Sequence, residues 1–116
     1  MRIIAKLTLA AILAACLTTD PAISKETGYV FVSSEKDHVV TVLDGTSYEL
    51  IKNIETSERP RHLQLTPDGS KLLAACGDGE AIDIIDLATL EVTDRIDGID
   101  DPEEFDLSPD GRFMYI

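Results

Sequence analysis

The residues best suited to binding chemistry form one basic cluster, Arg59-Pro60-Arg61-His62, in a chain that is otherwise rich in acids. Two guanidinium groups beside an imidazole present many N–H donors, so this cluster could hold an anion or the carboxylate of a cofactor. The alternative is a solvated loop in which Pro60 serves as a turn residue. Arg59, Arg61 and His62 are therefore candidate binding residues.

A second group of candidates is an acidic run between residues 97 and 106. Its members are Asp97, Asp100, Asp101, Glu103, Glu104 and Asp106. On a strand, Glu104 and Asp106 would point to the same side, because side chains alternate with a period of two. These carboxylates could bind a cation or a basic partner, and otherwise form a solvated loop. Glu104 joins the candidate binding residues.

Residues that could carry out catalysis are few. His38 and His62 are the only histidines, and no serine stands in a G-x-S-x-G context. Each Asp-Gly pair brings one acid per loop, which falls short of the about six to eight oxygen ligands that calcium takes. The sequence therefore predicts no catalytic residue, no bound cofactor and no metal ligand. It favours a binding role, and enzymatic activity remains an alternative.

The charge balance restricts the class of partner. The chain has 22 acidic residues against 10 Lys and Arg, and its net charge is −12. Such a surface repels nucleic acid and anionic lipid, because both attract cationic proteins. It suits basic proteins, cations or solubility alone. Nucleic acid is excluded as a partner.

The N-terminus has the pattern of an export signal. Arg2 and Lys6 form a basic start, and the apolar stretch 7–15 is too short to span about 30 Å of hydrocarbon. Leu13-Ala14-Ala15-Cys16 resembles the lipobox of bacterial lipoproteins, which implies cleavage before Cys16 and acylation of its thiol. The alternative is ordinary cleavage, for instance after Ala22. We expect a periplasmic protein that touches the membrane only through a lipid anchor.

The other cysteine, Cys76, has no partner within the chain if Cys16 is acylated or removed. A disulfide framework is therefore excluded. Cys76 ends the apolar run 72–76, where it is expected to be a small buried side chain.

From Tyr29 onward the chain matches itself at an offset of 42 residues without a gap. The clearest match is a turn, Pro67-Asp68-Gly69, which recurs as Pro109-Asp110-Gly111. In both copies proline favours a type I turn, and glycine supplies the positive φ that leads into the next strand. The chain therefore contains an internal repeat with a hairpin turn in each copy.

Short apolar stretches between turn signals predict strands and no helix beyond the signal peptide. The expected strands are 29–32, 39–43, 49–54, 61–66, 72–75, 81–85, 91–96, 104–107 and 113–116. Four short strands every 42 residues is the period of β-propeller blades. The predicted fold is all-β, with about two four-stranded antiparallel repeats.

Several segments together resemble a YVTN-type β-propeller repeat. They are 29–35, 40–44, 59–63 and 82–92, and the likeness extends over residues 29–116. The segment 101–105 is similar to a narrower group, the periplasmic propellers associated with pyrroloquinoline-quinone-dependent alcohol catabolism. The resemblance implies a ring of seven or so blades, of which this chain would be a fragment. The alternative is a natural two-blade protein that closes its ring by oligomerisation. We expect a signal peptide at 1–15, a tether at 16–28 and propeller repeats at 29–116.

The repeat architecture, the export signal and the lack of a catalytic set favour a non-enzymatic, exported binding or scaffold propeller. The resemblance of residues 101–105 implies that it is accessory to quinone-dependent alcohol catabolism. A protein partner or small ligand would bind at the propeller face, where Arg59, Arg61, His62 and Glu104 are the candidate mouth residues. One alternative is a fragment of a propeller oxidoreductase, either a quinoprotein or a haem d1-type enzyme. Another is a cell-surface interaction module.

Overall fold

The computed structural model describes residues 26–116, so the expected signal peptide, Cys16 and most of the expected tether lie outside the described part of the chain. Residues 26–116 contain nine β-strands and no helix. Across the same residues, no helix is available that could cross a membrane. The strands are β1 (Tyr29–Ser34), β2 (Val39–Asp44), β3 (Leu50–Glu55), β4 (Pro60–Leu65), β5 (Lys71–Cys76), β6 (Ala81–Asp86), β7 (Glu91–Asp97), β8 (Asp106–Leu107) and β9 (Met114–Tyr115).

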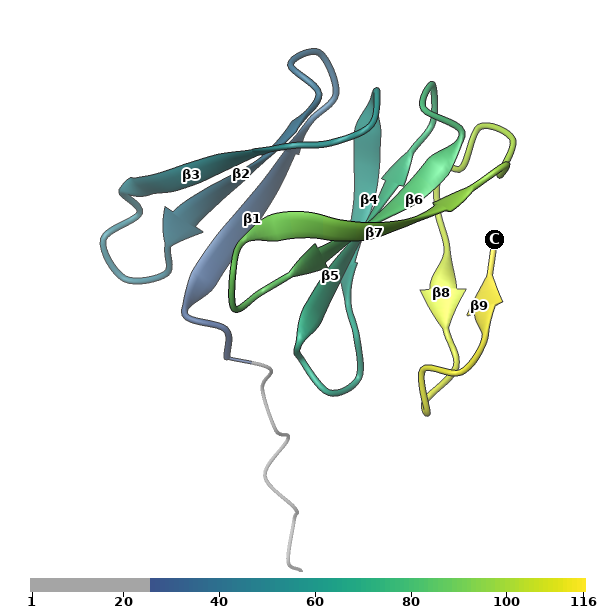
Figure 1. The fold of residues 1–116 in the computed structure, drawn as a ribbon. Coiled ribbons are helices and arrows are strands. Elements are labelled where there is room, and N and C mark those ends of the chain that lie inside the picture. The colour runs from purple at the N-terminus through teal and green to yellow at the C-terminus, as the bar shows by residue number, and fades with distance from the viewer. Residues whose placement is uncertain (1–25) are drawn as a thin grey trace, which may run out of the picture.

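These strands form three antiparallel sheets that follow one another along the chain (Figure 1). The first blade has three strands in the order β1-β2-β3, and the second has four in the order β4-β5-β6-β7. The third blade contains only β8 and β9 among the described residues. The predicted all-β fold and the positions of its strands are confirmed, although the strand expected at 104–107 is limited to Asp106–Leu107.

The sequence repeat and the blade are offset by one strand. The repeat that begins with β1 ends with β4, yet β4 pairs with β5 and belongs to the second blade. The reason lies in the connections. A tight turn joins β4 to β5 and keeps them paired, whereas residues 56–59 carry the chain from the far edge of one blade to the start of the next.

The Pro-Asp-Gly turns adopt the predicted geometry. The amide of Gly69 donates to the carbonyl of Thr66 at 2.9 Å, and that of Gly111 donates to the carbonyl of Ser108 at 2.8 Å. Gly69 and Gly111 have φ values of 70° and 69°. Both glycines thus take the left-handed conformation that a β-carbon would disfavour.

Other left-handed residues also recur with the repeat. Among residues 26–116, six residues other than glycine have positive φ, and they form three pairs that are 42 positions apart. The pairs are His38 with Glu80, Tyr48 with Leu90, and Arg59 with Asp101. The backbone of these connections is therefore copied from one repeat to the next, even where the side chains differ.

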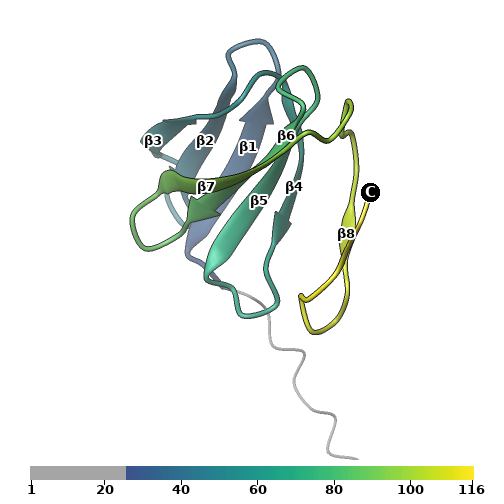
Figure 2. The same ribbon diagram turned by 45° about the vertical axis from the view of Figure 1, so that its right-hand side comes forward.

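In Figure 2 the second blade lies between the first and the third. The core consists of two apolar layers, one on each face of the second blade. The layer toward the first blade contains Val40, Val42, Ile54, Leu72, Ala74, Cys76, Ile85 and Leu90. The layer toward the third blade contains Leu73, Ala75, Ile82 and Phe105. Alternation along β5 and β6 supplies both layers, because neighbouring side chains on a strand point to opposite faces.

Cys76 is fully buried in the first of these layers, as expected from its apolar surroundings. Burial raises the pKa of its thiol to about 12. The thiol is therefore protonated at neutral pH and has little nucleophilic character.

Candidate functional site

The loops after β1, β3, β5 and β7 lie at one end of the molecule (Figure 1). Arg59 is the last residue of the loop after β3, and Arg61 lies near the start of β4. Arg59 Nη1 is 3.1 Å from Asp78 Oδ1, and its Nη2 is 2.5 Å from Asp101 Oδ1 and 3.7 Å from Glu103 Oε1. Arg61 pairs through Nε with Glu35 at 3.4 Å and through Nη1 with Glu103. We call these six residues the rim network.

The rim network carries an excess of negative charge, with four carboxylates around two guanidinium groups. It joins all three blades, because Glu35 follows β1, Asp78 follows β5, and Asp101 and Glu103 precede β8. An incoming anion would have to compete with these carboxylates for both arginines. The geometry therefore favours a cationic ligand over the anion that the basic cluster alone suggested.

The contacts between the second and third blades join equivalent positions of the repeat. Arg59 pairs with Asp101 and Arg61 with Glu103, and each pair is 42 residues apart. Farther along β4, the Nε2 amide of Gln64 donates to Asp106 Oδ1 at 3.1 Å, again over 42 residues. Equivalent residues of neighbouring blades thus face each other. Where the first copy of the repeat has arginine, the second has an acid, so the side chains at these equivalent positions attract each other.

His62 and Glu104 lie apart from the rim network, in a cavity of about 480 Å³ between β4 and β8. The His62 ring meets Phe105 edge to face with the ring centres 4.8 Å apart. Glu104 and Asp106 both line this cavity, which fits the expectation that they share a side. The residues in its wall are His62, Leu63, Gln64, Glu104, Phe105, Asp106 and Tyr115.

Asp83 is a buried carboxylate that the sequence analysis did not single out. Its side chain is fully buried on β6. It accepts hydrogen bonds from the Ser57 amide at 2.6 Å, the Ser57 hydroxyl at 2.9 Å and Arg95 Nε at 2.7 Å. The hydrogen bond from Arg95 raises the pKa of that guanidinium. An acid between apolar neighbours in Ile82-Asp83-Ile84 was the signal that could have revealed it.

The partners of Asp83 give it a role in shaping the rim. Ser57 belongs to the loop that carries the chain from the first blade to the second, two residues before Arg59. The counterpart of Asp83 in the first blade is Thr41, whose hydroxyl donates to Asn53 Oδ1 at 2.8 Å, and Asn53 is the counterpart of Arg95. The first blade thus has a neutral version of the same cross-strand contact. In the second blade the contact also holds the loop beneath the rim network.

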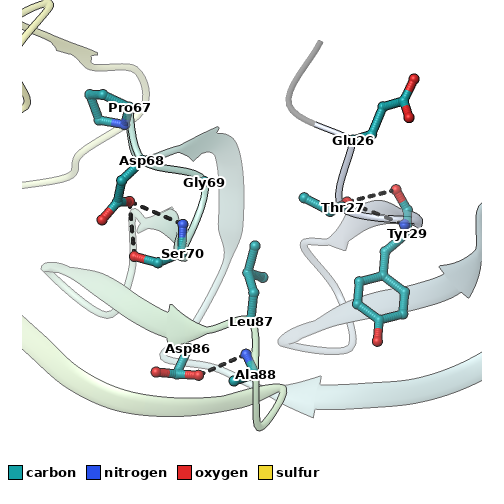
Figure 3. A pocket seen from close by; sticks show the side chains of 10 residues that line it. All are labelled: Glu26, Thr27, Tyr29, Pro67, Asp68, Gly69, Ser70, Asp86, Leu87 and Ala88. Atoms are coloured by element: carbon teal, nitrogen blue, oxygen red, sulfur yellow. Dashed lines mark hydrogen bonds between the residues drawn. The ribbon is translucent and has the colours of Figure 1, made fainter. Parts of the chain in front are cut away.

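A cavity of about 500 Å³ lies at the opposite end, between the start of β1 and the turns that follow β4 and β6 (Figure 3). Its carboxylates mainly close their own turns. Asp68 Oδ1 accepts from Thr66 Oγ1 at 2.7 Å and from the Ser70 amide at 3.0 Å, and these bonds lower the Asp68 pKa to about 2. Asp86 Oδ1 accepts from the Ala88 amide at 2.8 Å. Within residues 26–116, no group of three His, Cys, Asp or Glu side chains could hold a metal ion.

Consecutive antiparallel sheets that recur along the chain and pack face to face define the class of this protein as a β-propeller. The profile of the YNCE-like beta-propeller family matches residues 2–116, and the chain belongs to this family. No curated protein matches the chain.

Solved structures agree with this fold. Hydrazine synthase of Kuenenia stuttgartiensis matches with a TM-score of 0.70 and 24% identity over 77% of this chain. The dihydro-heme d1 dehydrogenase NirN matches with a TM-score of 0.66 and 26% identity over 87% of this chain. A functionally unknown protein from Desulfotomaculum acetoxidans has a TM-score of 0.66 and 18% identity over 77% of this chain. This chain spans 25%, 22% and 31% of the length of those three chains, respectively.

Proposed function

We propose that these blades belong to an exported, non-enzymatic propeller that binds a basic protein partner at the rim network and the adjoining cavity. The observation that carries this proposal is that both arginines of the rim are already paired with carboxylates. Acids therefore dominate the surface that a partner would meet. Lysine and arginine side chains of a partner would find carboxylate acceptors there, and the chain's net charge of −12 would speed the encounter.

The cavity between β4 and β8 adds to this surface. Glu104 is exposed in its wall, and no ion pair engages Glu104 among residues 26–116. Asp106 Oδ1 accepts hydrogen bonds from the Gln64 side-chain amide at 3.1 Å and from the Leu107 backbone amide at 2.8 Å, and neither donor carries a charge. A basic side chain could therefore enter the cavity and meet carboxylates that the protein itself has not neutralised.

A binding experiment tests this proposal with a hexalysine peptide and its fully acetylated form as probes. In the full protein, Glu104→Gln combined with Asp106→Asn should weaken hexalysine binding at least five-fold at low salt. The matched control is Glu49→Gln with Glu55→Gln, which removes the same charge from exposed residues at the two ends of β3. If both double variants lose the same affinity, attraction to net charge explains binding and the cavity between β4 and β8 is not a site.

The export part of the proposal depends on Cys16. We propose that its thiol is acylated and anchors the propeller in the periplasm. Labelled palmitate should enter the wild-type protein and be absent from Cys16→Ser. Label that persists in Cys16→Ser would contradict the anchor.

We also propose that the propeller is accessory to quinone-dependent alcohol catabolism, which the similarity of residues 101–105 supports. Deleting the gene should slow growth on alcohols oxidised by a quinoprotein dehydrogenase and leave growth on sugars unchanged. Equal growth of the deletion and the parent strain on such alcohols would remove this part of the proposal.

The second candidate is a propeller oxidoreductase, which the 26% identity to NirN over 87% of this chain favours. An absorption spectrum of the full protein, purified from its natural host, separates the two functions. A bound haem or quinone absorbs visible light, whereas a pure binding propeller is colourless. A stoichiometric chromophore would favour the oxidoreductase.

A further inference from the structure

The arginines of the rim network are less exposed than its carboxylates. The Arg59 side chain is 27% exposed, whereas the carboxylate side chains around it, Asp78, Asp101 and Glu103, are 53%, 58% and 59% exposed. A ligand that approaches this end of the molecule therefore meets carboxylate oxygens before it meets a guanidinium group.

Arg59 brings together acids from two connections. Asp78 belongs to the turn after β5, and Asp101 and Glu103 belong to the segment between β7 and β8. Without a cation between them, these like charges would repel one another. The guanidinium group contacts Asp78 through Nη1 and the other two through Nη2. Its planar fork fixes the direction of each N–H, which a lysine ammonium group does not.

The surrounding backbone fixes Arg59 in place. Its φ is 60°, its amide donates to His38 Nδ1 at 3.0 Å, and its carbonyl accepts from the Gly77 amide at 3.1 Å. Gly77 also leaves room for the ion pair, because a β-carbon there would lie 2.6 Å from both Arg59 Nη2 and Asp101 Oδ1. Both atoms are ends of flexible side chains. A larger residue at position 77 would therefore displace the ion pair and leave the backbone where it is.

We propose that Arg59 is a positioning residue of the binding surface. It holds Asp78, Asp101 and Glu103 together as one outward-facing group of acceptors for a lysine or arginine side chain of the basic partner. This role rests on the proposed function, and it names the part of the rim that the partner's cation contacts. Three carboxylates around one guanidinium leave an excess of negative charge for the partner. Because Arg59 already holds them together, binding does not have to gather them.

Removing Arg59 tests the proposal, because positioning and net charge predict opposite results. Arg59→Met makes the full protein more negative, so attraction to net charge alone would strengthen hexalysine binding. We expect binding to weaken about five-fold at low salt instead, because the carboxylates move apart. The matched control is Arg112→Met, which removes the same charge from an exposed arginine between β8 and β9 and should not weaken binding. If Arg59→Met binds as tightly as Arg112→Met, the proposal is wrong.

Two further variants leave the charge of the rim unchanged. Gly77→Ala displaces the pair of Arg59 with Asp101, and Arg59→Lys keeps the cation but loses the fork that reaches both connections. Both should weaken hexalysine binding in the full protein, whereas the affinity for net charge is the same as in the wild type. Unchanged binding in both variants would overturn the positioning role.

Neutralising the acids separates positioning from a general effect on the fold. Asp101→Asn with Glu103→Gln should weaken hexalysine binding, and Arg59→Met added to this double variant should cause no further loss, because Arg59 acts through the carboxylates. A further loss of about five-fold would show that Arg59 only supports the fold, and would overturn the proposal. If Asp101→Asn with Glu103→Gln binds hexalysine as tightly as the wild type, the rim is not the binding surface. The proposed function then fails there, and the role of Arg59 fails with it.

Discussion

Among single residues, Asp83 is the one buried charged side chain in the described part of the chain. Its buried carboxylate is stabilised by three donors, and two of these come from the connection between the first and second blades. Removing a buried acceptor leaves its donors without partners. The loss of stability is then larger than the net stabilisation that the hydrogen bond provides. The contact therefore stabilises the fold and also positions the rim.

We expect Asp83→Ala to lower the free energy of unfolding by about 2–3 kcal/mol, because the Ser57 amide and Arg95 lose their acceptor. The matched control is Thr41→Ala, the equivalent position of the first blade, where the hydrogen bond is exposed and the cost should be about 0.5 kcal/mol. Urea unfolding measures both. Equal losses would show that the loop contact adds nothing.

Asp68 makes the stability of the fold depend on pH in the acidic range. Its folded pKa of about 2 lies below the ordinary value of 3.8, mainly because of the hydrogen bond from the Thr66 hydroxyl. The unfolded chain therefore takes up the proton first as pH falls. The contribution of Asp68 is complete above pH 4 and is lost between about pH 4 and pH 2. The melting temperature should fall less between pH 4 and pH 2 in Asp68→Asn than in Glu55→Gln, which serves as the control. An unchanged slope would contradict this role.

At the level of elements, the rim network shows how a repeat can specify contacts between its own copies. Like charges at equivalent positions of two blades would repel, and the change from arginine to acid turns repulsion into attraction. Each pair is partly exposed, so its contribution is about 0.2–1 kcal/mol. Such pairs fix how neighbouring blades meet more than they raise stability.

Reversing one pair tests this idea. Arg61→Glu should destabilise the protein, because its carboxylate would face Glu103 and Glu35. The double variant Arg61→Glu, Glu103→Arg should recover part of that loss, with a coupling energy of about 0.5 kcal/mol. Thermal unfolding at low and high salt measures the coupling. If the losses of stability in Arg61→Glu and Glu103→Arg simply add in the double variant, the contact between the two copies contributes no net stability.

The strands were predictable because apolar alternation and the Pro-Asp-Gly turns recur with the repeat. The division of the strands into blades was not predictable, because the residues of β4 do not indicate whether it pairs with β3 or with β5. Arg59 and Arg61 were recognised as candidates, but their carboxylate partners were not, because the pairing depends on how two blades pack. Asp83 was overlooked because two of its three donors come from Ser57, in a loop far from it in sequence.

For the molecule as a whole, the outward face of the first blade is unusual. Tyr48 is 68% exposed, whereas its counterpart Leu90 is 8% exposed. Leu50 and Val32 on the same face are also exposed, although their counterparts in the second blade are more buried. Apolar faces of propeller blades are buried by neighbouring blades. The repeat thus assigns this face to contact with another blade.

In a complete ring we therefore expect Val32→Asp to destabilise the protein by about 3 kcal/mol or more, as a buried charge does. Ala74→Asp, at the matched and already buried position, gives the reference cost. Urea unfolding of the full protein compares the two. If Val32→Asp costs no more stability than a substitution at an exposed position, another blade does not cover this face.

The left-handed residues that recur between repeats have a consequence for protein engineering. Asparagine adopts positive φ more readily than most side chains, whereas tyrosine does so at a cost of about 1 kcal/mol. Tyr48 has a φ of 59° and a largely exposed side chain. Its replacement by asparagine should raise the melting temperature in the 116-residue chain. The two copies of this turn share a backbone but not their side chains, so a designer could gain stability at such a turn wherever its side chain stays exposed.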